Sequence, residues 1–172
     1  MIIRELSALE YENCVPRLAD ILIDAVDSGA GVTFMWPLAQ DVGEDYWRSQ
    51  HSGIASGSTI QFVVEEDGVI VGTVMLQKAW APNQPHRCDV AKLLVHRDFR
   101  RRGLGRLLMQ ALEDKARALG LTLITFDTVA GGGPEAFYRQ MGFTCVGYIP
   151  AYAYAKGNLD TTALFYKLLK QP

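Results

Sequence analysis

The segment Ala91–Leu119 constrains the fold of this chain more than any other stretch. It reads AKLLVHRDFRRRGLGRLLMQALEDKARAL, which predicts a strand, an arginine-glycine turn and an amphipathic helix that begins at Leu104. Because the strand 89–95 is apolar on both of its alternating faces, we expect it in the middle of a sheet that is covered on both sides. The segment therefore predicts an α/β domain. Lys92 interrupts the apolar pattern, and the rest of the sequence does not explain it.

The other elements follow from hydrophobic periodicity and from turn residues along the 172-residue chain. Asp67-Gly68 predicts a hairpin between two strands. No repeat, linker or low-complexity tract divides the sequence, so we expect residues 1–172 to form a single domain. The expected helices are 15–26, 38–55, 104–119 and 135–141, and the expected strands are 1–6, 59–66, 69–76, 89–95, 121–126, 143–148 and 162–169.

Composition excludes several classes of protein. Hydrophobic residues make up 49% of the chain and charged residues 21%, which is typical of a globular protein. A net charge of −2 argues against a nucleic-acid partner. The three cysteines Cys14, Cys88 and Cys145 form no C-x-x-C pair, which argues against a disulfide framework or a zinc knuckle. No signal peptide or membrane-spanning run is visible, so we expect a cytoplasmic protein without a membrane partner.

The turn 100–106 has the features of a phosphate-binding site. A helix N-terminus presents unpaired N–H groups and partial positive charge, and Gly103 and Gly105 let a ligand approach the backbone. The alternative interpretation is that the arginine run is only the solvent-exposed start of a helix and that the glycines only form a turn. A dinucleotide-binding motif is excluded because its third glycine position is Leu108, and a Walker loop is excluded because no Gly-Lys-Ser/Thr follows. Fixed positive charge comes from Arg100, Arg101, Arg102 and Arg106.

Two motifs together resemble the GNAT superfamily of N-acetyltransferases. Arg100-x-x-Gly103-x-Gly105 after a strand matches the coenzyme A motif Q/R-x-x-G-x-G/A, and 136–143, AFYRQMGF, resembles the family's A-x-x-F-Y-x-x-x-G-F signature. The resemblance covers nearly the whole chain. It implies a GNAT fold, which is a single mixed central sheet of about six to seven strands flanked by about four helices. Strands 4 and 5 of that fold are splayed to hold acetyl-CoA.

The resemblance also implies a function. The expected reaction moves an acetyl group from acetyl-CoA to a primary amine of a small molecule, by direct attack in a ternary complex, in a monomer or homodimer. Within the family, the segments 29–35, 127–131 and 148–152 resemble the tabtoxin resistance acetyltransferases, which makes an amino-acid-like toxin or antibiotic a candidate acceptor. The alternatives are a protein N-terminal or lysine acetyltransferase and a non-catalytic acyl-CoA-binding sensor.

The resemblance implies that Leu104, within the turn, also binds the cofactor. It further implies cofactor contacts outside the turn. Tyr138 is the candidate general acid, because a phenol with a pKa of about 10 can donate a proton to a departing thiolate. Packing in an amphipathic helix is the alternative role for this tyrosine. The backbone of Leu93, Leu94 and Val95 is expected to bind the pantetheine arm and the thioester carbonyl, with Thr128 and Pro134 near the pantetheine.

The acceptor side is expected to hold carboxylates and aromatic walls. Asp89 and Asp127 are predicted to end neighbouring strands, to face the wedge between them, and to bind the amine or remove its proton. Strand-end capping is the alternative for both. Phe34, Trp36 and Tyr152 lie in segments that form the acceptor pocket in the family. The three histidines share no metal-ligand spacing, so no metal site is expected.

Overall fold

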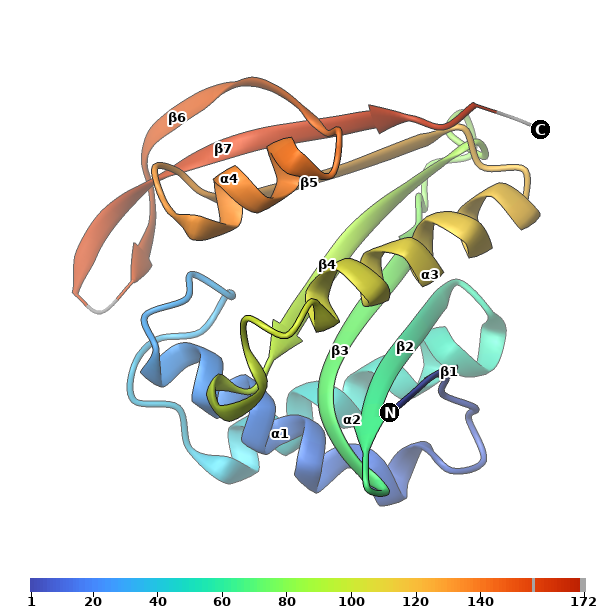
Figure 1. The fold of residues 1–172 in the computed structure, drawn as a ribbon, viewed down its shortest axis with the longest axis vertical. Coiled ribbons are helices and arrows are strands. Elements are labelled where there is room, and N and C mark those ends of the chain that lie inside the picture. Colours follow the sequence, from blue (N-terminus) through green and yellow to red (C-terminus); the bar gives the residue numbers. More distant parts are fainter. Residues whose placement is uncertain (156, 171–172) are drawn as a thin grey trace.

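The computed structural model describes residues 1–155 and 157–170. The described strands form one mixed sheet in the order β1-β2-β3-β4-β5-β7-β6, and four α-helices flank it (Figure 1). The predicted α/β architecture is therefore confirmed. The elements are β1 (Ile2–Glu5), α1 (Tyr11–Asp27), α2 (Gln40–Ser56), β2 (Thr59–Glu66), β3 (Val69–Lys78), β4 (Arg87–Val95), a 3-10 turn (Arg97–Phe99), α3 (Leu104–Ala118), β5 (Leu123–Val129), α4 (Gly133–Gln140), β6 (Thr144–Ala155) and β7 (Asn158–Leu168).

Two hydrophobic cores hold the layers together, one on each face of the sheet. On one face, α1 and α2 pack against β2 and β3, with Leu22 and Trp47 fully buried. On the other face, α3 buries Leu108 and Leu112 against the same strands, and this core continues under α4 and along β5 and β7. Because both faces are covered, the inner strands are apolar on both sides, as the sequence of β4 predicts.

β4 and β5 separate soon after they meet. Their parallel pairing covers only Arg87↔Leu123, Cys88↔Ile124 and Asp89↔Thr125. Beyond these pairs, β4 stays with β3 as far as Val95, whereas β5 stays with β7. In Figure 1 the β5–β7–β6 arm, which carries α4, diverges from β4. The splay predicted for strands 4 and 5 is confirmed, and it leaves the facing edges of both strands without ladder partners.

A β-bulge interrupts β4 where it leaves β5. Met75 pairs with Ala91 but Thr73 pairs with Leu94, so Lys92 and Leu93 together oppose a single residue of β3. Lys92 has a φ of 51°, which is rare for a residue with a side chain. Such a bulge bends the strand and redirects its side chains.

Several element boundaries differ from the prediction. α1 begins at Tyr11 rather than at residue 15, and β6 extends well past the predicted residue 148. Within the described ranges, no helix is long and apolar enough to cross a membrane.

Candidate active site

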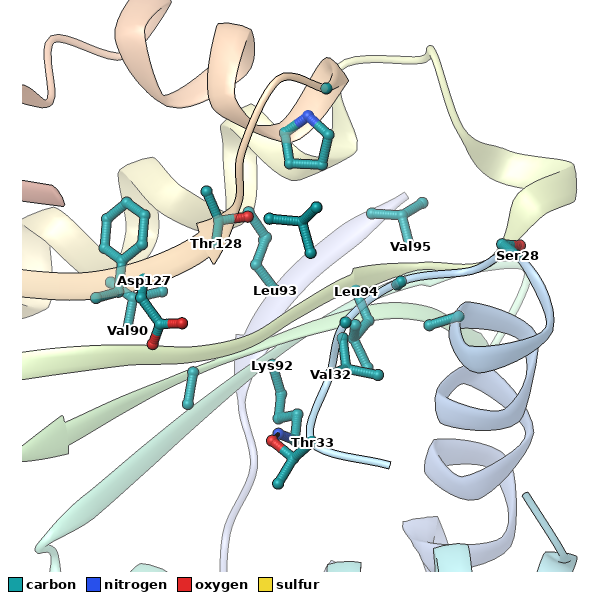
Figure 2. Close-up of a pocket in the computed structure, with 18 of the residues that line it drawn as sticks. Ser28, Val32, Thr33, Val90, Lys92, Leu93, Leu94, Val95, Asp127 and Thr128 are labelled. Carbon is teal, nitrogen blue, oxygen red and sulfur yellow. Dashed lines mark hydrogen bonds between the residues drawn. The ribbon is translucent and has the colours of Figure 1, made fainter. Parts of the chain in front are cut away.

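A cavity of about 640 Å³ fills the wedge between β4 and β5 (Figure 2). The bulged half of β4 forms one wall and the end of β5 the other. The loop that follows α1 and the start of α4 close its two sides. Its lining includes residues 28–33, 90–95, 126–129, Ala25, Arg100, Gly132, Pro134 and Tyr138.

Most of the predicted pantetheine contacts are brought together in this cavity. Figure 2 shows Leu93 directed toward Thr128, on the opposite side of β4 from Lys92. An extended chain lying here would find β4 backbone groups that the ladder does not use. The predicted residues that line the cavity are Leu93, Leu94, Val95, Arg100, Thr128, Pro134 and Tyr138.

The turn before α3 has an open helix N-terminus that fits a pyrophosphate. Gly103 has a φ of 79°, no side chain caps α3, and its first turn holds no acidic residue. A Cβ on Gly105 would meet only the ring of Phe137, at 3.8 Å, so packing does not require glycine there. Glycine inside a helix costs about 1 kcal/mol relative to alanine. Its presence leaves backbone accessible from outside, which suits a phosphate ligand.

The predicted arginines of the turn divide into two groups. Arg100 is fixed by hydrogen bonds to the protein: its guanidinium donates to the Val95 carbonyl at 2.8 Å and to Ser28 Oγ at 3.1 Å. Arg102 pairs with Glu66 at 3.1 Å. Arg101 and Arg106 form no ion pair with any residue in the described ranges, so their charge is available to a ligand. Leu104 contributes only backbone, because its side chain is buried in the core.

Asp24 anchors this turn, and the sequence analysis did not find it. It lies near the end of α1, is only 6% exposed, and accepts hydrogen bonds from both Arg97 and Arg100. The backbone N–H of Arg97 also donates to it, at 2.9 Å. The signal in the sequence that could have indicated Asp24 is a carboxylate on the otherwise apolar face of a helix. Asp24 thus ties α1 to the chain that leads into the pyrophosphate turn.

Tyr138, the predicted general acid, lines the wedge cavity from α4. Its ring packs 4.2 Å from that of Phe126, centroid to centroid, and its hydroxyl forms no hydrogen bond with the described part of the chain. Burial raises the pKa of the Tyr138 hydroxyl, so the phenol is neutral and carries its proton at pH 7. A protonated, unpaired hydroxyl in the wedge can donate to a leaving group.

The two predicted carboxylates have different positions. Asp89 is the third residue of β4, not its end, and it lies where β4 and β5 still pair. It accepts hydrogen bonds from Arg87 at 2.6 Å and from Thr125, and it lines a shallow depression outside the wedge. The prediction that Asp89 faces the wedge is therefore wrong: β4 begins earlier than expected. Asp127 does line the wedge, and it accepts a hydrogen bond from Thr162 at 2.9 Å.

The predicted aromatic walls are only partly realised. Trp36 and Tyr152 are 55% and 52% exposed and do not line the wedge cavity, so their predicted placement in an acceptor pocket is not observed. Phe34 packs edge-to-face on Tyr46, with ring centroids 5.1 Å apart. Lys92, which the sequence pattern left unexplained, has its ammonium near both rings. It lines the cavity and extends from the bulge toward Thr33 (Figure 2). No metal-binding group of His, Cys, Asp and Glu occurs among the described residues.

The model of the acetyltransferase (GNAT) family matches residues 31–143. The chain belongs to the GNAT family. An uncharacterised N-acetyltransferase of Azospirillum brasilense is 34% identical over 112 residues, which cover 64% of this chain and 65% of that relative. The chain matches only 30% and 29% of the length of two further curated relatives.

Solved structures of other proteins share the GNAT fold of this chain. A GNAT superfamily phosphinothricin acetyltransferase from Sinorhizobium meliloti, in complex with acetyl-CoA, has a TM-score of 0.81 at 19% identity, over 98% of this chain and 88% of that one. A ribosomal-protein-alanine N-acetyltransferase from Brucella melitensis has a TM-score of 0.78 at 20% identity, over 98% and 100%. At these identities the likeness establishes the fold alone.

Proposed function

We propose that this protein is an acetyl-CoA-dependent N-acetyltransferase that modifies a primary amine of a small molecule. The observation that carries the proposal is the wedge itself. Asp127, Tyr138 and Arg100 line the cavity between its splayed strands, and the open helix N-terminus of α3 follows Arg100 along the chain. The phosphinothricin and ribosomal-protein-alanine acetyltransferases share this fold but differ in the class of acceptor that their names give. The proposed acceptor class therefore rests on the residues of the wedge and not on structural similarity.

The residues of the wedge fit acetyl-CoA from end to end. The N–H groups at the start of α3, with Arg101 and Arg106, would hold the pyrophosphate. The free edge of β4 at 93–95 would hydrogen-bond the pantetheine arm and polarise the thioester carbonyl. Acetyl-CoA supplies an acetyl group that is already activated as a thioester.

For each remaining step of the transfer, a side chain of the wedge could accept or donate the proton that moves. The acceptor amine must lose a proton to become a nucleophile, and the Asp127 carboxylate can receive it directly or through water. The amine then attacks the acetyl carbonyl while both molecules are bound. Tyr138 holds the proton that the departing sulfur requires. The Asp127 carboxylate accepts a hydrogen bond from the Thr162 hydroxyl, which fixes its orientation.

Thiol release tests the proposal. The protein is mixed with acetyl-CoA and a panel of metabolite amines, free thiol is followed with a colorimetric reagent, and products are identified by mass spectrometry. We expect Tyr138→Phe to lower kcat about 10²- to 10⁴-fold, because it removes one general acid. Its acetyl-CoA dissociation constant should stay near the wild-type value. Tyr154→Phe, at an exposed tyrosine, is the matched control. Unchanged turnover would remove Tyr138 from the mechanism.

The same panel separates the alternatives. Amino-acid-like toxins and antibiotics belong in it, since the resemblance of 29–35, 127–131 and 148–152 to tabtoxin resistance acetyltransferases makes them candidate acceptors. Acetylation of short peptides but of no small amine would support a protein acetyltransferase. Tight acetyl-CoA binding without thiol release, across peptides and amines alike, would support a sensor.

A further inference from the structure

Lys92 places an ammonium group in the wedge, and no described residue forms an ion pair with it. Its Nζ donates to Thr33 Oγ1 at 3.1 Å and lies 5.1 Å and 5.8 Å from the ring centroids of Tyr46 and Phe34. No carboxylate of the described residues comes within 4.0 Å of it. An ammonium has three donors, and the described residues satisfy one of them.

An unpaired, half-buried cation is unfavourable for the fold. Burial lowers the pKa of Lys92 to about 8, and the negative charge of Asp127 opposes this only in part. The amine is nevertheless mostly charged at pH 7. Tyr46, the titratable group packed against it from α2, has a pKa raised by burial and carries no charge there. A half-buried cation in such surroundings is stabilised by a negative partner.

The pyrophosphate of the cofactor is not that partner. Lys92 and Leu93 leave β4 on opposite sides, and Lys92 points toward Thr33 and the loop after α1 (Figure 2). The turn that fits the pyrophosphate follows Val95, beyond the end of β4. Asp127 lines the same cavity as Lys92 but does not pair with it. Arg100, the other cation in the lining, is paired with Asp24. The cavity therefore presents Lys92 and Asp127, which are not paired with each other, to a single small ligand.

We propose that the acceptor carries a carboxylate close to its primary amine, as an α-amino acid does, and that Lys92 binds this carboxylate while Asp127 faces the amine. The inference rests on the proposed function and names its substrate class. The two unused donors of Lys92 would bind the carboxylate oxygens. The rings of Phe34 and Tyr46 hold the ammonium in place by cation–π contact.

The proposal predicts discrimination between amines that differ only in the carboxylate. Suitable pairs are lysine with cadaverine, ornithine with putrescine, and alanine with alaninamide. A hydrogen bond between charged groups that forms only with the acid corresponds to about 10- to 100-fold in kcat/KM. We expect the wild-type protein to favour the carboxylate-bearing member of each pair by this factor.

The decisive measurement is the change in this ratio on substitution of Lys92. In Lys92→Met the preference should fall to near one, and Lys92→Arg, which keeps the charge, should restore part of it. Lys78→Met, at an exposed lysine of β3, is the matched control and should leave the ratio unchanged. Because both members of a pair are measured on the same preparation, the ratio does not depend on the active fraction. Comparing proteins also cancels the different basicity of the two amines.

The possible results separate this inference from the proposed function. If neither member of any pair nor any other amine is acetylated, the proposed function fails. If both members are acetylated equally by the wild-type protein, or if Lys92→Met keeps the preference, the role of Lys92 is refuted and the acetyltransferase remains. Should Lys92→Met not fold, the wild-type ratios alone decide, since a preference below about threefold is too small for a charged hydrogen bond.

Discussion

Asp24→Asn tests whether a buried carboxylate holds the cofactor-binding turn in position. The substitution keeps the shape of the side chain but removes its charge. Asp24 accepts the Arg97 backbone N–H at 2.9 Å, the Arg97 guanidinium, and the Arg100 guanidinium at 2.9 Å. The asparagine amide would place an N–H₂ group against one of these donors. The substitution therefore loses at least one charge-assisted hydrogen bond and weakens another.

The loss of stability expected for Asp24→Asn depends on how exposed its two arginine partners are. Removing one member of a fully buried ion pair costs about 3–5 kcal/mol. Here the side chains of Arg97 and Arg100 are 50% and 39% exposed, so water recovers part of their solvation. We expect the free energy of unfolding to fall by about 2–3 kcal/mol. For a domain of this size, that lowers Tm by about 4–10 °C.

The functional effect should exceed that of a general loss of stability. Without its anchors, the turn after β4 samples more conformations, and acetyl-CoA must order it on binding. We expect the dissociation constant, measured by calorimetry well below Tm, to rise about tenfold, equivalent to about 1.4 kcal/mol. Asp20→Asn is the control, one turn earlier on α1, where the carboxylate is 49% exposed and pairs with Arg17 at 3.7 Å. An Asp24→Asn protein with wild-type Tm and affinity would refute this reasoning.

Three further predictions concern buried or paired groups. Lys92→Met should raise the free energy of unfolding at pH 7 by about 1–3 kcal/mol, because it removes a desolvated cation. This gain should vanish as pH rises from about 8 to 10.5, because wild-type Lys92 becomes neutral over that range. An equal gain at all pH values would contradict this prediction. The N–H of Gly131, donating to Glu135, lowers the pKa of that carboxylate to about 2, so its stabilising contribution is present above pH 4.5 and lost as pH falls toward 2. Thermal unfolding of Glu135→Gln should therefore differ from wild type at pH 7 and converge with it in acid, and a constant difference would refute the assignment. Cys88 is fully buried and burial raises the pKa of its thiol to about 12, so mass spectrometry should find it unmodified by iodoacetamide at pH 8 while half-buried Cys145 reacts; rapid labelling of Cys88 in the folded protein would contradict the structure.

The layers of this fold could be predicted because short-range patterns encode them. The apolar spacing of α3 and the Asp67-Gly68 hairpin appear in the structure where the sequence places them. The ends of strands were predicted less accurately, because they depend on pairing with strands far along the chain. β6 continues past residue 148 because β7 offers it partners as far as Asn158, opposite Ala155. The same dependence moved the start of β4 back to Arg87 and left Asp89 outside the wedge.

Site residues that make local motifs could be predicted, and those that act through tertiary contacts could not. Gly103 and Tyr138 belong to contiguous signatures. Asp24 acts on a turn more than 70 residues away, and only the folded chain shows that its helix ends beside Arg97. Lys92 was visible as an irregularity in an apolar strand, but its meaning depends on Thr33 and on two rings from other segments.

The bulge at Lys92 joins the two halves of the proposed site. Two residues of β4 oppose one of β3 there, so the strand turns away from β5 just after the last parallel pair, Asp89↔Thr125. That turn opens the wedge and frees backbone groups for the pantetheine arm. Lys92 leaves this bulge on the opposite side from Leu93, toward Thr33. In the proposed complex, this one irregularity therefore lies beside both the thioester and the ammonium group that the acceptor would meet.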